Sequence, residues 1–234
     1  MGRKILLWLL WVGFIIYVLL LAPLDQPGTL TYIRKLLTLQ WAALNPFAAV
    51  LFSLMGVWPM IYAGLMFIDS RGQSIPAWPA FLASNGAGAI GLLPYLILRS
   101  PNPEFSGSKN IWLKLLDSRA YGVLLSLTTA GLLVYAWLAG DWVDFMHQWH
   151  TDQFIHAMSL DFCLLCLVFP SLLGDDMARR GLRSPQLFWA VTLIPLLGAL
   201  AYLCLRPPLV EAGEDAVSTQ PSQGLGNSFK LEVD

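Results

Sequence analysis

The feature that most constrains this chain is a series of long apolar segments, each close to the length that crosses a bilayer. A membrane-spanning helix needs about 20 predominantly apolar residues. The pattern therefore predicts an all-α fold, a polytopic membrane bundle of six transmembrane helices. The approximate limits of these segments are 5–22, 47–68, 77–98, 120–140, 154–173 and 186–205.

Composition supports the same class of protein. Of the 234 residues, 56% are hydrophobic and only 12% are charged, whereas soluble domains carry about 25% charged residues. A soluble protein of this size could not bury so much apolar surface, so membrane lipids are the expected surroundings. The net charge of −1 gives no general attraction to nucleic acid, and we expect no nucleic-acid partner.

The same segments predict how the chain is divided. Residues 1–23 are expected to form an N-terminal membrane anchor helix, because their apolar stretch is too long for a typical signal peptide. Residues 24–46 are expected to form an interfacial amphipathic segment, although an ordinary loop helix fits equally well. A five-helix membrane domain follows at 47–206. The polar remainder, 207–234, is predicted to be a disordered tail, and its last residues resemble translated cloning sites. No internal repeat is apparent.

Charge in the loops predicts an orientation. If the spans alternate, the N-terminus, the loop 69–76 and the loop 141–153 lie on one side with the C-terminus. The opposite side, with 99–119 and 175–183, then carries more lysines and arginines. Such loops stay in the cytoplasm, so we expect 99–119 and 175–183 there. The basic start of the chain, "MGRK", argues for the reverse.

Three polar side chains inside the predicted spans are the candidate functional residues. His156 and Asp161 interrupt the fifth span, where an ionisable group is costly unless it faces protein or water. Asn85 lies at a similar depth in the third span, beside small residues that allow close helix packing. We therefore expect a hydrogen bond between Asn85 and Asp161. It could serve packing alone, or it could belong to a proton relay or to a polar ligand contact.

The histidines raise the question of a cofactor or a metal. His156 could be the axial ligand of chlorophyll or haem, because imidazole binds such metals; it could equally be a hydrogen-bonded residue near the membrane edge. A bound chlorophyll or carotenoid is the cofactor considered. His147 and His150 are weak candidates for a divalent metal site, because they supply fewer ligands than a tight site needs. The pair Cys163 and Cys166 has the spacing of a C-x-x-C motif, but small apolar side chains explain it.

The run "GDDMARR" has a simple physical interpretation. Its acidic residues stand four positions before its arginines, which favours ion pairs at a helix end. Arg179, Arg180 and Arg183 are expected to contact anionic lipid headgroups, or else a partner protein. The chain contains no nucleophile elbow, zincin motif, phosphate loop or EF-hand loop. The sequence therefore does not indicate an enzyme.

Six phrases of the sequence are distinctive as a set: "NPFAAVLFSLMGVWPMIYAGLMFID", "IPAWPAF", "LLPYLILR", "WLKLLDSRAYGVLL", "FIHAMSLDFCLLCLVFPSLLGDDMARRG" and "IPLLGALAYLCLRPP". Together they resemble an uncharacterised integral membrane family of cyanobacteria and chloroplasts. The resemblance covers about residues 45–208 and implies a location in a photosynthetic membrane, the thylakoid or the cyanobacterial plasma membrane.

Two functions remain open at this stage. The resemblance favours a non-enzymatic accessory protein that assists the assembly or stability of a pigment–protein complex, with photosystem or other pigment–protein subunits as partners. The alternative is a carrier or an intramembrane enzyme for a small or lipidic molecule, built around Asn85, His156 and Asp161.

Overall fold

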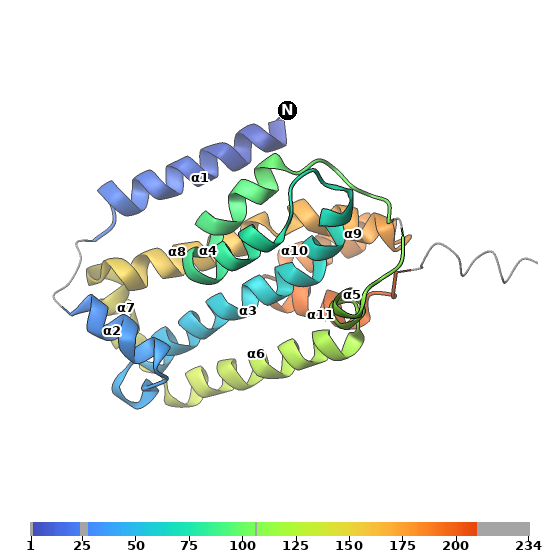
Figure 1. Cartoon of the computed structure of the whole chain (residues 1–234). Helices are drawn as coiled ribbons and strands as arrows, with labels where there is room; N and C mark the ends of the chain where they lie inside the picture. Colours follow the sequence, from blue (N-terminus) through green and yellow to red (C-terminus); the bar gives the residue numbers. More distant parts are fainter. Residues whose placement is uncertain (1, 24–27, 106, 210–234) are drawn as a thin grey trace, which may run out of the picture.

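The computed structural model describes residues 2–23, 28–105 and 107–209, and every regular element in this part of the chain is helical (Figure 1). Most of the predicted disordered tail, 210–234, lies outside the described residues. Two short 3₁₀ helices, η1 (Trp41–Ala43) and η2 (Ser70–Gly72), flank the longest helix. The α-helices are α1 (Gly2–Leu20), α2 (Thr29–Leu37), α3 (Pro46–Asp69), α4 (Trp78–Leu98), α5 (Ile111–Leu116), α6 (Arg119–Ala139), α7 (Trp142–Thr151), α8 (Gln153–Val168), α9 (Pro170–Arg179), α10 (Pro185–Leu193) and α11 (Leu197–Leu205).

Five segments in the described residues are long and apolar enough to cross a membrane: Gly2–Leu20, Pro46–Gly72, Trp78–Leu98, Arg119–Ala139 and Gln153–Arg179. The predicted sixth span, 186–205, is not one helix. The chain breaks between α10 and α11, where Leu196 adopts a φ of 61° beside Pro195. Proline has no N–H to donate and disfavours a helical residue before it, so α10 ends there. The prediction of six continuous spans is not confirmed.

Helix α4 folds back on itself. Ala87 and Gly88 have non-helical backbone angles, and the helix reverses direction there. Gln73, which precedes α4, exchanges two hydrogen bonds with Ser100, which follows it, at 2.7 and 2.8 Å. A straight helix of 21 residues would hold these residues about 30 Å apart. We call residues 78–98 the first hairpin, because both of its ends lie at the same end of the molecule.

Helices α10 and α11 form an equivalent second hairpin. A Cβ on Gly198 would stand 2.3 Å from the carbonyl oxygen of Val191, so the two arms touch through their backbones. Arg180, which precedes the hairpin, donates to the carbonyl oxygen of Pro207, which follows it. The residues 185–205 therefore also enter and leave at one end of the molecule.

The two hairpins belong to an internal repeat. In the first half, Asp69 accepts hydrogen bonds from Tyr95 and Arg99, 26 and 30 residues further on. In the second half, Asp176 accepts from Tyr202 and Arg206 at the same separations. Each half thus consists of a long helix followed by a hairpin, α3 with α4 and α8–α9 with α10–α11. The expectation of no internal repeat is wrong. The repeat is not apparent in the sequence because only a few widely spaced residues carry it.

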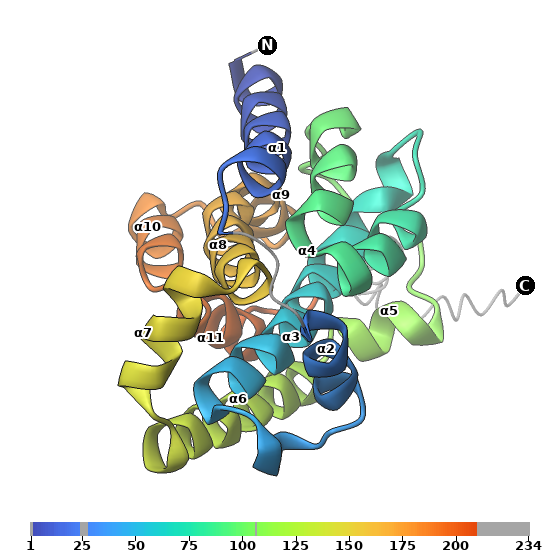
Figure 2. The same cartoon turned by 90° about the vertical axis from the view of Figure 1, so that its left-hand side faces the viewer.

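The repeat places all of these polar residues at one end of the bundle. We call it the arginine end, because it carries Arg99, Arg179 and Arg206. We call the opposite end, near which His156 lies, the histidine end. Its helices α2 and α7 face the viewer in Figure 2. Helices α1, α3, α6 and α8–α9 run from one end to the other. The predicted separation of 99–119 and 175–183 from the histidines is confirmed.

The places predicted for the other loops are wrong. The start of α1 lies at the arginine end, where Arg3 donates to the carbonyl oxygen of Arg99. The loop 70–77 and the residues after α11 lie there too. The reason is physical: two of the six apolar segments fold back and leave the molecule at the end where they entered.

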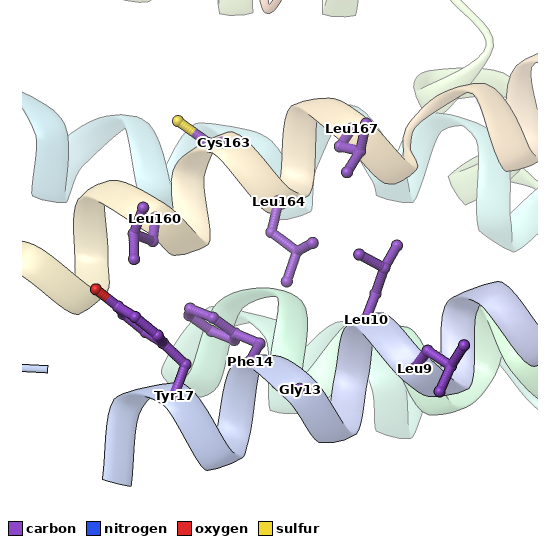
Figure 3. Close-up of a pocket in the computed structure, with 9 residues that line it drawn as sticks. All are labelled: Leu9, Leu10, Gly13, Phe14, Tyr17, Leu160, Cys163, Leu164 and Leu167. Carbon is purple, nitrogen blue, oxygen red and sulfur yellow. The ribbon is translucent and has the colours of Figure 1, made fainter. Parts of the chain in front are cut away.

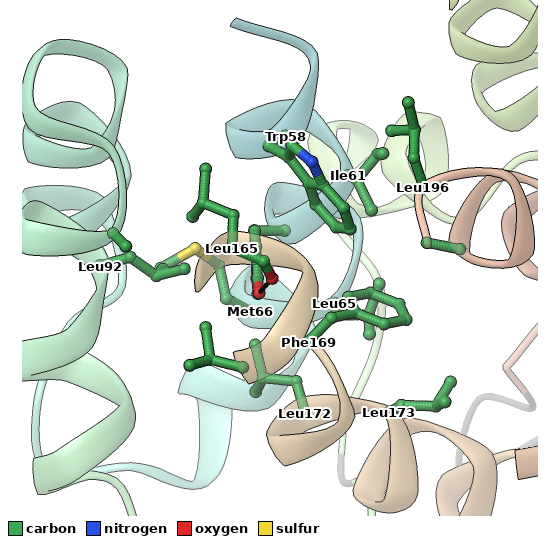
Figure 4. Packing of buried hydrophobic residues seen from close by; sticks show 14 of the residues in the cluster. Trp58, Ile61, Leu65, Met66, Leu92, Leu165, Phe169, Leu172, Leu173 and Leu196 are labelled. Atoms are coloured by element: carbon green, nitrogen blue, oxygen red, sulfur yellow. Dashed lines mark hydrogen bonds between the residues drawn. The ribbon is translucent and has the colours of Figure 1, made fainter. Parts of the chain in front are cut away.

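The apolar core lies where α3 crosses α8–α9. Trp58, Leu65, Phe169 and Leu172 pack against each other there, with Leu92 of the first hairpin beside them (Figure 4). The hydroxyl of Tyr62 donates to the carbonyl oxygen of Leu165 at 2.6 Å, near the break between α8 and α9. The core therefore fixes both long helices under the tip of the first hairpin.

Candidate functional site

The candidate site lies where Asp161 of α8 meets the tip of the first hairpin. Both carboxylate oxygens accept from the backbone N–H of Ala89, at 2.9 and 3.2 Å. Ala89 begins the second arm, 89–98, whose first N–H groups have no partner within the helix. A carboxylate is favourable there, because the N-terminal end of a helix carries a partial positive charge. Asp161 therefore caps a helix that begins inside the bundle.

Gly88 makes this approach possible. Its backbone φ of 50° is one that residues with a side chain rarely adopt. A Cβ at this position would stand 1.6 Å from a carboxylate oxygen of Asp161. Only glycine can combine the reversal of α4 with such close contact. The glycine-rich sequence around position 88 thus forms the tip of a hairpin as well as a surface for helix packing.

A cavity of about 520 Å³ opens beside this tip. Asp161 lines it and is only 7% exposed. Residues 84–88 form one wall, and α1, α2, α3 and α8 contribute the others. Its lining is mainly apolar: Phe14, Val18, Leu37, Phe52, Met55, Gly56, Ile90, Phe154, Ala157 and Met158. The size and the small number of polar groups are typical of sites for small organic molecules.

Asn85 lines the same cavity, but it does not make the expected hydrogen bond to Asp161. Its amide nitrogen donates to the carbonyl oxygen of Phe81 at 2.7 Å, within the first arm of the hairpin. The reason is that the break in α4 creates an unpaired backbone donor at Ala89, and Asp161 accepts from it instead. Asn85 and Asp161 therefore lie at the same cavity, but the predicted hydrogen bond between them is wrong.

His156 lies outside this cavity, near the histidine end. One ring nitrogen is 2.9 Å from the hydroxyl of Tyr17, and the other is 2.9 Å from the carbonyl oxygen of Trp149. The ring also packs on Trp149, with 4.5 Å between the ring centroids. Metal coordination by His156 would have to displace one of these hydrogen bonds. Its role as a pigment ligand stays a prediction.

A second, apolar groove runs between α1 and α8 (Figure 3). It has a volume of about 540 Å³ and is lined by Leu9, Leu10, Gly13, Phe14, Tyr17, Leu160, Cys163, Leu164 and Leu167. Phe14 lines both this groove and the cavity beside Asp161. The side chain of Phe14 therefore separates the polar tip of the hairpin from the outer face of the bundle.

The weak metal candidates stay without further ligands in the described structure. No group of three or more histidine, cysteine or acidic side chains that could hold a metal ion occurs among the described residues. Asp144, three residues before His147, accepts from Asn45 and Gln148. Asp152 caps α8 by accepting from the backbone of Ile155.

The predicted lipid contacts divide into two kinds. Arg183 is exposed and stays a predicted headgroup contact. The side chains of Arg179 and Arg180 are fully buried and paired inside the protein, with Asp69 at 3.0 Å and with Asp117 at 2.7 Å. These two arginines hold the arginine end together. They do not lie where a headgroup could reach them, because the hairpins cover them.

Electrostatics at the arginine end depend on these pairs. Burial acts to lower the pKa of the Arg180 guanidinium, but Asp176 and Asp117 outweigh burial and raise it. For Arg206, burial lowers the pKa, and Asp176 only partly offsets it. The predicted ion pair between Asp176 and Arg180 is confirmed at 2.8 Å. The other members of the network were not predicted: Asp69, Arg99, Asp117 and Arg206. The available signal was the recurrence of "YLILR" and "YLCLR", each at the same distance after an aspartate.

Comparisons with protein-family models, curated proteins and solved structures find no match for this chain. The resemblance to a family of photosynthetic membranes therefore stays an expectation. The hairpin tip and its cavity are the features of the described structure that indicate a function.

Proposed function

We propose that this chain is an integral membrane carrier that binds a small molecule in the cavity beside Asp161. The observation that carries the proposal is a discontinuous helix, α4, whose tip meets an acidic side chain inside the bundle. Many transporters bind their substrates with the ends of broken helices near the middle of the membrane.

The depth of the site supports this function. Asp161 is eight residues from the start of α8 at Gln153, which corresponds to about 12 Å along the helix. Gly88 is ten residues from either end of α4, or about 15 Å from the arginine end. The hydrocarbon core of a bilayer is about 30 Å thick. A bundle that crosses it would hold the cavity near its middle.

The proposed topology has α1, α3, α6 and α8–α9 crossing the bilayer, with the two hairpins entering it from one side as re-entrant segments. Every lysine and arginine in the described part of the chain lies at the arginine end, except Arg34 and Lys35. Positive charge is retained in the cytoplasm, so the arginine end faces the cytoplasm in this proposal.

The groove between α1 and α8 supports a lateral route to the cavity. It faces outward, where lipid chains would lie, and only Phe14 is shared between it and the cavity. In this proposal, movement of the Phe14 side chain connects the two spaces. A molecule dissolved in the membrane could then reach Asp161 without passing through water, which fits a small or lipidic ligand.

A carrier fits the cavity better than an intramembrane enzyme. Among the described residues that line it, Asp161 is the one ionisable side chain, and neither cysteine, histidine nor lysine accompanies it. General acid–base or nucleophilic chemistry usually needs a second group within hydrogen-bonding distance of the first. Binding and release need only the cavity itself.

The test is the capture of a small molecule by the intact protein. Wild-type protein, purified in a mild detergent, should carry a bound small molecule that mass spectrometry detects. Ala157→Phe, which fills the cavity, should lose it. Ala130→Phe, on the exposed face of α6, is the matched control and should retain it. Equal retention by the two folded variants would contradict the proposal.

The accessory function expected from the resemblance stays a prediction, and the same preparation bears on it. An accessory protein of a photosynthetic membrane should co-purify with pigment or with pigment–protein subunits in stable proportion. A carrier should purify as a colourless protein with its own ligand. An absorption spectrum of the preparation therefore separates the two functions.

A further inference from the structure

The chemistry of the cavity also indicates which class of ligand it takes, provided that the proposed binding function holds. Asp161 has no counter-ion: the described residues that line the cavity include neither lysine nor arginine. Its recorded partner is a single backbone N–H, that of Ala89. The start of the second arm supplies about half a unit of positive charge, so a full opposite charge close by would further stabilise an ionised Asp161 in these apolar surroundings. A cationic ligand would supply that charge.

The broken helix adds to this preference. The first arm, 78–86, points its C-terminal end at the cavity, and such an end carries a partial negative charge and carbonyl groups without helical partners. The positive end of the second arm is already occupied by Asp161. Asn85 uses one of its two amide N–H groups within the first arm, so its oxygen and one N–H remain for a ligand. Acceptors therefore make up a large part of the polar surface left to a ligand, with the carboxylate of Asp161 as its one ionisable group among the described lining residues.

The apolar walls fit an organic cation better than a metal ion. Phe14, Phe52 and Phe154 line the cavity together with Met55 and Met158. Aromatic rings attract cations through their negative faces, and methionine side chains adapt to irregular apolar groups. A bare metal ion would need several oxygen ligands in place of these walls. A volume of about 520 Å³ also exceeds what such an ion requires.

We propose that the cavity binds an amphipathic organic cation, a protonated amine or a quaternary ammonium with an apolar body. The cationic group lies against the carboxylate of Asp161 and the oxygen of Asn85. The apolar body lies among the phenylalanine and methionine side chains.

The test uses two water-soluble probes of opposite charge and similar shape, benzyltrimethylammonium and benzylsulfonate. Their binding to the full chain in lipid nanodiscs is measured by isothermal titration calorimetry, with empty nanodiscs as the blank. The wild-type protein should bind the cation saturably with one site, and the anion not at all. Asp161→Asn should weaken binding of the cation by about tenfold or more. Asparagine retains an acceptor for Ala89, so the hairpin should stay folded, which a thermal melt verifies.

The contribution of the aromatic rings to cation binding is tested with a second pair of variants. Phe52→Leu removes a ring from the cavity wall and should weaken cation binding by several-fold. Phe188→Leu, outside the cavity, should leave it unchanged. Equal binding of the two probes, no binding of the cation, or an unaffected Asp161→Asn variant would overturn the cationic class. The small molecule lost from Ala157→Phe but kept by Ala130→Phe would then still support a binding cavity for another kind of ligand.

Discussion

At the scale of single residues, the structure explains why an aspartate occurs in an apolar span. Asp161 pairs with the backbone of Ala89, at the start of a helix that begins inside the bundle. A leucine at position 161 would insert into a membrane more readily, but it would leave that N–H unpaired, at a cost of about 1–3 kcal/mol. Gly88 is also needed for this contact, because any side chain at position 88 would collide with the carboxylate of Asp161.

The first prediction concerns Gly88→Ala. Alanine would have to adopt a positive φ and would push its methyl group into Asp161, so we expect a loss of about 1–3 kcal/mol in the free energy of unfolding. Denaturant titration of the detergent-solubilised protein measures it. Gly131→Ala, in α6 with nothing near its Cβ position, is the control and should be neutral or slightly stabilising. Equal stability of the two variants would show that the tip is not constrained as described.

At the scale of elements, each hairpin is tied to the long helix that precedes it. Arg99 donates to Asp69 at 2.6 and 2.8 Å and also pairs with Asp175. Arg206 pairs with Asp176 at 3.3 Å and donates to the carbonyl oxygen of Leu116 at 2.8 Å. These arginines follow directly after the returning arms. They fix the arms at the arginine end, so that the tips reach a defined depth.

The second prediction tests these ties. Arg99→Met keeps most of the side-chain volume but removes a buried partner of Asp69, so we expect the protein to lose about 3–5 kcal/mol of stability. Arg71→Met is the matched control: Arg71 lies at the same end, exposed, with a hydrogen bond to the carbonyl oxygen of Ser108. It should change stability by about 0.5 kcal/mol or less. Thermal unfolding of both variants in the same detergent measures the difference, and similar melting temperatures would refute the role given to Arg99.

Hydropathy could not distinguish the hairpins from spans. The first hairpin has 21 residues, nearly all of them apolar or small, which is the length of a crossing helix. Its reversal depends on Gly88, and that of the second hairpin falls at Pro195 and Leu196. Glycine and proline are common within membrane helices, so their presence alone did not indicate a reversal. The contact with Asp161, 72 residues away in the chain, decides it.

At the scale of the whole molecule, the two halves are alike, but α1 and α6 pack differently on the neighbouring long helices. Helices α1 and α6 occupy equivalent places, since each packs on the hairpin of its own half. Helix α6 also packs closely on α3, where Tyr121 donates to the carbonyl oxygen of Met60 at 2.9 Å. Helix α1 stands away from α8, and the apolar groove lies between them. The open groove between α1 and α8 therefore has no counterpart between α6 and α3.

The third prediction tests the topology. Single cysteines at Ser74, Ser108 and His147, in a chain without its native cysteines, are labelled with an impermeant thiol reagent in intact cells and in inverted vesicles. Positions 74 and 108 should react from the same side, because the first hairpin returns to its starting end. Position 147 should react from the other. Six straight spans would instead place 74 with 147, and that result would exclude a re-entrant hairpin.

The sequence by itself determined the class of the protein and the place of its most important polar residues. The apolar segments required helices in a membrane, and the high cost of a buried charge singled out Asp161. The sequence also placed Asn85 at a similar depth in a neighbouring segment, and both residues line the cavity. These conclusions depend on local composition and on the energetics of the bilayer, which a sequence shows directly.

Only the tertiary structure decided the path of the chain and the partners of its polar groups. The direction of an apolar segment after a glycine depends on what lies at its tip, and here that is a carboxylate from another helix. The buried arginines likewise depend on acidic residues about 30 and 110 positions away. Such contacts are long-range, so composition and periodicity could not predict them, and they turn six apolar segments into a bundle with two hairpins.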